Sequence, residues 1–145
     1  MNIKKTANLL LNFAIKRIAE IFGIIIFGSG LLLLISLLSY SPDDPNFIFP
    51  DNTQIKNLLG FQGSFISDIF FQSVGLVSYL ISLTFLITGI NIFRTKEFFL
   101  FIENIFFVIL YSIFGTLFLT HFYSDIFTFY INGNGGFVGN YLNQT

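Results

Sequence analysis

The clearest chemical candidates in the sequence are the carboxylates of the segment Ser41-Pro42-Asp43-Asp44-Pro45, which follows a long apolar run. Together with Asp51, Asp43 and Asp44 could supply oxygen ligands to a cation such as Ca²⁺, although their spacing matches no dense loop of alternating ligands. Each proline disfavours helical geometry in the residue before it, and Ser and Asp side chains satisfy free backbone groups in turns. The segment therefore predicts the end of a helix and a turn, with a Ca²⁺ site as the alternative.

Other reactive groups are isolated along the chain. His121 is the single histidine, and the absence of cysteine excludes disulfides, thiolate catalysis and Cys-ligated metals. The glycine-rich stretch 133–139 is followed by no Lys-Ser or Lys-Thr pair, so it does not match a phosphate-binding loop. The sequence therefore predicts no catalytic residue, no cofactor site and no metal ligand outside the acidic segment.

The composition indicates a chain embedded in lipid. Hydrophobic residues make up 54% of the 145 residues and charged residues only 10%, with 22 Phe. Soluble domains carry about 25% charged residues. The net charge of −1 offers no electrostatic basis for binding nucleic acid. We expect the lipid bilayer to be a partner and expect no direct contact of this chain with nucleic acid.

Three charge-free stretches are long enough to cross the hydrocarbon core as helices, which takes about 20 residues. They are residues 21–40, 69–93 and 104–124, and residues 98–102 could extend the third toward its start. The first lacks a cleavage pattern and is predicted to remain as an anchor. The fold class is thus an all-α membrane protein with three transmembrane helices. The absence of Asp, Glu, Lys and Arg in these spans argues against an ion pump.

The positive charges predict the orientation. All Lys and Arg residues except Lys56 either precede the first span or lie in the turn at residues 94–97. Because cytoplasmic loops are enriched in Lys and Arg, the N-terminus and this turn are predicted to be cytoplasmic. Residues 41–68 and 125–145 are then extracytoplasmic.

Residues 1–20 have a pattern of their own, and we separate them from a membrane domain at 21–145. Apolar residues recur there at helical spacing, with Lys and Asn largely on the other face. This predicts a cytoplasmic amphipathic helix along the headgroups, with partner binding as the alternative. In the second span, Ser78 and Ser82 form a small-xxx-small pair that favours close helix packing.

Three motifs carry a resemblance to a known family. The residues of the first are Ser39, Tyr40, Ser41, Pro42, Asp43, Asp44 and Pro45; those of the second are Asn57, Gly60, Gly63, Asp68, Gly75 and Tyr79; those of the third are Gly135, Gly136 and Gly139. In these motifs and their order the chain resembles the N-terminal four-helix membrane region of bacterial FtsK/SpoIIIE DNA translocases. Ser64 and Ser78 stand where that family usually has Ala. The sequence predicts a partial four-helix bundle, since the chain ends before a fourth span.

The resemblance implies an anchoring and interaction role in cell division and its coupling to chromosome segregation. It implies the bacterial inner membrane at the division septum, a homo-oligomer, and contacts with divisome membrane proteins. The motif residues are expected to be structural or to contact partners. The family's ATPase motor lies outside this region, and with no Walker A motif here we predict no enzymatic activity for this chain. A small transporter or channel subunit is the alternative.

Overall fold

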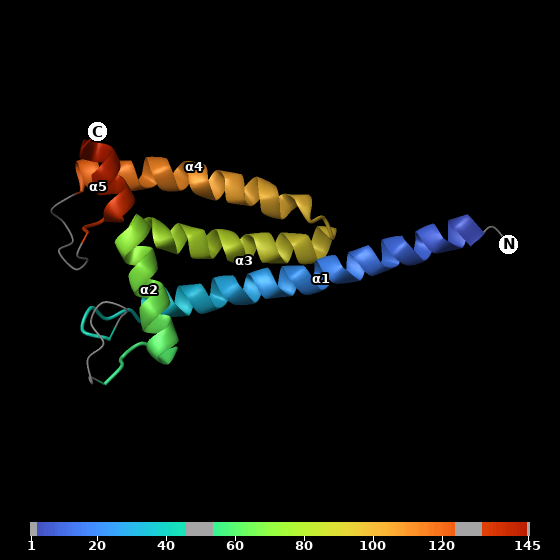
Figure 1. Cartoon of the computed structure of the whole chain (residues 1–145), viewed down its shortest axis with the longest axis horizontal. Coiled ribbons are helices and arrows are strands. Elements are labelled where there is room, and N and C mark those ends of the chain that lie inside the picture. Colours follow the sequence, from blue (N-terminus) through green and yellow to red (C-terminus); the bar gives the residue numbers. More distant parts are fainter. Residues whose placement is uncertain (1–2, 46–53, 124–131, 145) are drawn as a thin grey trace.

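The computed structural model describes residues 3–45, 54–123 and 132–144. Across these ranges the chain folds into five helices and no strands. The helices are α1 (Ile3–Leu38), α2 (Gly60–Val74), α3 (Val77–Thr95), α4 (Phe99–Phe122) and α5 (Gly136–Gln144). Figure 1 shows α1, α3 and α4 as three long rods of alternating direction, with α2 and α5 gathered at one end.

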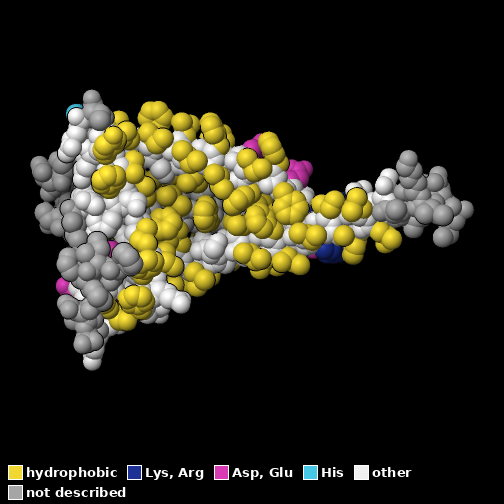
Figure 2. Space-filling model, in the orientation of Figure 1, with side chains coloured by type: hydrophobic (Ala, Val, Ile, Leu, Met, Phe, Trp, Pro, Cys, Tyr) yellow, Lys and Arg dark blue, Asp and Glu magenta, His cyan; other side chains and the backbone are white. Residues whose placement is uncertain are grey.

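Three helices are long and apolar enough to cross a membrane, within Asn8–Leu38, Val77–Thr95 and Phe99–Phe122. This confirms the all-α class and the predicted number of spans. The third span is α4, which begins at Phe99, so the residues before Asn104 do extend this span toward its start. The spans bury polar side chains and expose apolar ones, the reverse of a protein in water. Ser36, Ser78 and Thr116 are at most 1% exposed, whereas large hydrophobic side chains cover the outer surface (Figure 2).

The first helix is continuous from Ile3 to Leu38. The residues 3–20, expected as a separate amphipathic helix, form its N-terminal half and project past the α3–α4 turn (Figure 1). Residues 3–22 contain neither Pro nor Gly to end a helix. The division at residues 20 and 21 therefore does not coincide with a break in the helix, and the placement of residues 3–20 along the headgroups stays a prediction.

The second predicted span needs a correction. Residues 69–93 are not one helix, because α2 ends at Val74 and α3 begins at Val77. Gly75 has a positive φ of 58°, a conformation that glycine adopts readily, and its N–H donates to the Phe71 carbonyl at 2.9 Å. Residues 69–74 belong to α2, which runs across the end of the bundle (Figure 1), so α3 alone is the second span.

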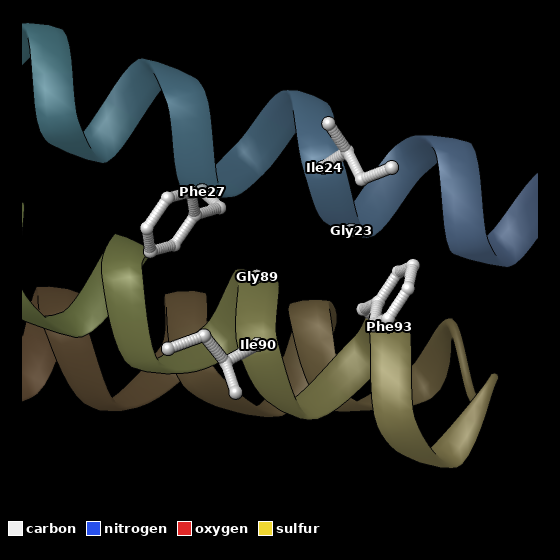
Figure 3. A pocket seen from close by; sticks show the side chains of 6 residues that line it. All are labelled: Gly23, Ile24, Phe27, Gly89, Ile90 and Phe93. Carbon is white, nitrogen blue, oxygen red and sulfur yellow. The ribbon is translucent and has the colours of Figure 1, made fainter.

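Small residues bring α1 and α3 into close contact. Along α1 the buried residues other than Ser36 follow an alternating spacing of four and three, which is typical of left-handed helix pairs; they are Ala19, Gly23, Ile26, Gly30, Leu33 and Leu37. Gly23 and Gly89 face each other across the pair (Figure 3), and a Cβ on Gly23 would lie 2.8 Å from the Gly89 carbonyl oxygen. Ser78 and Ser82 of α3 are fully buried, in agreement with their predicted packing role.

Polar side chains join α3 to α4. Asn104 donates from Nδ2 to the Thr88 hydroxyl at 2.9 Å, and the hydroxyls of Thr84 and Tyr111 lie 2.9 Å apart. Such bonds between transmembrane helices stabilise a bundle in which hydrophobic association is absent. They hold α4 to α3 while most of the α4 surface stays exposed for lipid.

Candidate functional site

The three sequence motifs meet at the end of the bundle that carries α2 and α5 (Figure 1). We call the described residues 39–45, 57–79 and 132–139 the motif layer. It lies at the opposite end from the α3–α4 turn. Segments more than fifty residues apart in the chain are hydrogen-bonded to one another there, for example Asn132 to Gln72.

Asp44 fixes the loop that leads from the first motif to the second. Its side chain is 4% exposed, and its two carboxylate oxygens accept the backbone N–H groups of Lys56 and Asn57, each at 2.8 Å. Asp43 is instead solvent-exposed and pairs with the Lys56 ammonium at 2.9 Å. The hydrogen bond and charge of Asp43 raise the pKa of Lys56 above its ordinary value. The two adjacent aspartates thus have different roles, one buried in the turn and one on the surface.

Asn57 connects the loop to both flanking helices. Its Nδ2 donates to the Ser36 carbonyl at 2.9 Å, and its Oδ1 accepts the Leu59 N–H at 3.0 Å. A Cβ on Gly63 would collide with Asn57 Oδ1, and the Ser36 hydroxyl donates to the Gly63 carbonyl at 2.5 Å. Gly63 is therefore required for the close approach of α2 to the end of α1.

Hydroxyl groups complete the connection between the first two motifs. Ser39 Oγ accepts the Leu58 N–H at 3.1 Å, and Ser64 Oγ donates to the Pro45 carbonyl at 3.0 Å. The Ser41 carbonyl accepts the Asp44 N–H at 3.2 Å, which closes the turn over Pro42. Ser64 is 1% exposed, and this bond gives its buried hydroxyl an acceptor.

An aromatic cluster lies between the end of α1, α2 and α3. The Phe71 ring is fully buried, with its centroid 4.9 Å from that of Tyr40 and 5.5 Å from that of Tyr79. The Tyr40 hydroxyl donates to Asp68 Oδ1 at 3.1 Å, and the Tyr79 hydroxyl donates to the Leu37 carbonyl at 3.3 Å. Both tyrosines thus bury their rings while their polar ends find partners.

Gly75 joins the third motif to the α2–α3 junction. The Leu76 N–H donates to the Asn134 carbonyl at 2.9 Å, and a Cβ on Gly75 would collide with that same carbonyl. Asn132 Nδ2 donates to Gln72 Oε1 at 2.8 Å. Sequence reasoning missed Asn132 and Asn134, and only their position beside the third motif could have pointed to them.

Gly135, Gly136 and Gly139 fit three tight positions. Gly136 has a φ of 65°, and a Cβ there would lie 2.7 Å from the Ser73 carbonyl oxygen. A Cβ on Gly139 would lie 2.6 Å from the Thr116 carbonyl oxygen of α4. The spacing of the third motif therefore matches the contacts of α5 with α4 on one side and α2 on the other. Gly60 lies at the start of α2 with a φ of 66°, a backbone conformation that favours glycine.

The Ca²⁺ alternative finds no support in the described part of the chain. No group of three His, Asp or Glu side chains there could hold a metal ion, and Asp51 lies outside the described residues. His121 sits at the exposed end of α4 with Nδ1 3.4 Å from Asn143 Oδ1. Since the oxygens of Asp44 are committed to backbone donors, the arrangement supports a structural role for this carboxylate.

Basic residues gather at the other end of the bundle. Glu20 of α1 accepts Arg17 at 2.5 Å and the Lys96 ammonium at 2.7 Å, which ties the α3–α4 turn to α1. Arg94 lies in the last turn of α3. Figure 2 shows few charged side chains between this end and the motif layer. The charge-free length between them is the part of the bundle suited to the hydrocarbon core.

Spans, polar interior and apolar exterior define a multi-pass helical membrane protein. A profile of the 4TM region of DNA translocase FtsK/SpoIIIE matches residues 15–145, and the chain belongs to this family. The resemblance carried by the three motifs is thereby confirmed.

Individual relatives agree with the family match. The chain is 36% identical over 72 residues to a DNA translocase FtsK of Rickettsia prowazekii. The matched segment covers 50% of this chain and 10% of the relative. It is 38% identical over 78 residues to that of Rickettsia bellii, covering 54% and 10%, and 33% identical over 69 residues to that of Rhizobium meliloti, covering 48% and 8%. The matched segments thus span about a tenth of these relatives. No solved structure matches.

Proposed function

We propose that this chain acts as the membrane-anchoring and interaction region of an FtsK-like DNA translocase, at the division septum of the bacterial inner membrane. The family match over residues 15–145 carries this proposal. The chain contains the membrane region of the family and no motor domain within its 145 residues. Its part in coupling cell division to chromosome segregation would then be to hold and position, while ATP-driven translocation belongs to another part of the family's architecture.

The motif layer is the proposed contact surface for other divisome membrane proteins and for further copies of the chain. Its buried hydrogen bonds hold a rigid outer end on the three spans. Pro42 and Asp43 are exposed members of the layer. The buried bond between Asp44 and Asn57 holds the turn that carries them. With the N-terminus cytoplasmic, as the basic residues favour, this surface faces the extracytoplasmic side.

Septal enrichment tests the proposal. A fluorescent fusion of the chain in dividing bacteria should concentrate at midcell, and a uniform membrane signal would contradict it. Asn57→Ala should reduce both septal signal and folding, whereas Asp43→Ala changes only an exposed side chain. If Asp43→Ala keeps the protein folded and abolishes septal enrichment, the surface of the layer carries the partner contact.

The channel or transporter alternative has weaker support. The polar side chains between α3 and α4 are engaged with one another, as in the Thr88–Asn104 and Thr84–Tyr111 pairs. A conduction path through the bundle would need polar groups that face a water-filled space. Ion flux through vesicles containing the purified chain would favour this alternative over an anchor.

A further inference from the structure

Helix α2 has its polarity reversed relative to a helix that packs on a protein in water. The residues buried toward the rest of the molecule are small or polar, apart from Phe71; they are Gly63, Ser64, Ser67 and Asp68. Ser67 is fully buried and donates to the Gly63 carbonyl at 2.8 Å, and Asp68 accepts the Tyr40 hydroxyl. The polar face of α2 therefore packs inside the protein, where Ser67 and Asp68 make hydrogen bonds.

The outward face of α2 and its entry is apolar. Leu58 is 77% exposed, Phe61 49%, Ile66 41% and Ile69 46%. Asp68 is the helix's charged residue and is buried, and Gln62 is the polar side chain on the exposed face. Removal of such side chains from water is favourable. A surface helix normally turns its apolar stripe to the core, so this face requires an apolar environment outside the protein.

The length and direction of α2 fit a helix lying in one leaflet. Its 15 residues would extend about 22 Å, too short to span the hydrocarbon core. Figure 1 shows it crossing the end of α1 and α3 rather than continuing along them. Only Gly75 and Leu76 lie between α2 and α3, so α2 joins a transmembrane span without a polar linker.

An apolar crevice lies beneath α2. It has a volume of about 270 Å³, and its walls include Leu32 and Leu33 of α1, Ile66 and Phe70 of α2, and Phe85 of α3. Leu32 and Ile66 are themselves exposed, at 54% and 41%. The crevice therefore connects the outward face of α2 with the lipid-facing side of α1.

We propose that α2 is immersed in the leaflet on the motif-layer side, with its outward face against lipid and a phospholipid acyl chain in the crevice beneath it. A helix of this kind buries its apolar face about 5–10 Å into the boundary between headgroups and acyl chains. The motif layer is thus seated at the membrane surface rather than held above it. This placement depends neither on septal localisation nor on which side of the membrane is cytoplasmic.

The chain contains no Trp, so single substitutions provide unique fluorophores. Phe61→Trp reports on the outward face and Phe70→Trp on the crevice, each with a modest change of shape. Phe106→Trp, on the lipid-facing side of α4, and Lys56→Trp, in the exposed loop, serve as lipid and water references. Each variant is reconstituted into phosphatidylcholine vesicles whose chains are brominated either near the headgroup or near the chain terminus, and iodide is supplied on both sides.

Phe61→Trp and Phe70→Trp should lose most of their emission with lipids brominated near the headgroup and little with iodide. Phe61→Trp quenched by iodide like Lys56→Trp would overturn the immersion of α2. Phe70→Trp insensitive to both brominated lipids would overturn the occupied crevice. Circular dichroism of each variant confirms the helical fold, and Leu58→Trp repeats the outward-face test without touching α2 itself.

Discussion

The carboxylate of Asp44 accepts the backbone N–H of Asn57 at 2.8 Å, and this bond between residues thirteen positions apart joins the first motif to the second. Lys56 donates its N–H to the other carboxylate oxygen. Both donors belong to the segment that enters α2. A buried carboxylate that accepts backbone donors makes charge-assisted hydrogen bonds, which are stronger than neutral ones. The acidic stop after α1 thus sets the position of α2 on the bundle.

Asp44→Ala should lower the free energy of unfolding by about 1–3 kcal/mol, because two backbone N–H groups lose their acceptor. Circular dichroism during unfolding of the detergent-solubilised protein measures this. The matched control is Asp43→Ala, whose side chain is 74% exposed, because solvent screens a surface ion pair of this kind and leaves it little effect on stability. Equal losses in both variants would contradict the buried role of Asp44.

Gly75→Ala should destabilise the protein by at least about 1–3 kcal/mol, the range for a residue held in a sparsely populated backbone conformation. The added Cβ also meets the Asn134 carbonyl, so the third motif should detach from the α2–α3 junction. Protease sensitivity of residues 132–144 reports that detachment. Gly28→Ala is the control, because a Cβ there has no neighbour within 4 Å. A stable, protease-resistant Gly75→Ala protein would refute this role.

Gly89→Leu should separate α1 from α3. A side chain at this position meets the backbone of Phe27, which cannot move aside as a side chain can, and overpacking of this kind costs about 1–3 kcal/mol or more. The unfolding midpoint in detergent should fall accordingly. Gly115→Leu on α4 is the comparison, since its nearest neighbour is the Val77 side chain at 3.1 Å. We expect the smaller loss there.

The Thr88–Asn104 bond should contribute about 0.6 kcal/mol, the average for hydrogen bonds between transmembrane helices. A double-mutant cycle with Thr88→Val and Asn104→Leu isolates the pairwise energy. Thr84→Val with Tyr111→Phe provides a second cycle for the other bond between α3 and α4. Coupling energies near zero in both cycles would mean that these polar pairs do not hold α4 to α3.

Orientation is testable because the chain has no cysteine. With the basic end cytoplasmic, Lys56→Cys should react with a membrane-impermeant maleimide in intact spheroplasts. Thr95→Cys should react only after the cells are opened. Both positions are exposed, so accessibility to reagent depends on the side of the membrane and not on burial in the protein. The reverse labelling pattern would invert the proposed topology.

Hydropathy alone determined much of this fold. The scarcity of charge and the long apolar stretches specify helices in lipid, because each backbone polar group must be satisfied within the segment. The beginning of α4 at Phe99 and the burial of Ser78 and Ser82 agree with those expectations. The order of the motifs was also sufficient to indicate the family, and it required no knowledge of their contacts.

Tertiary structure decided what the apolar runs could not express. Residues 69–93 contain no charge at which to place an end, yet the backbone turns at Gly75, where the Asn134 carbonyl occupies the space that a side chain would need. The pairing of Asp44 with Asn57, and of Tyr40 with Asp68, likewise depends on where α2 lies. Composition therefore specifies whether a segment lies in lipid or in water. The direction in which the segment runs depends on contacts between distant parts of the chain, and only the folded chain brings those contacts together.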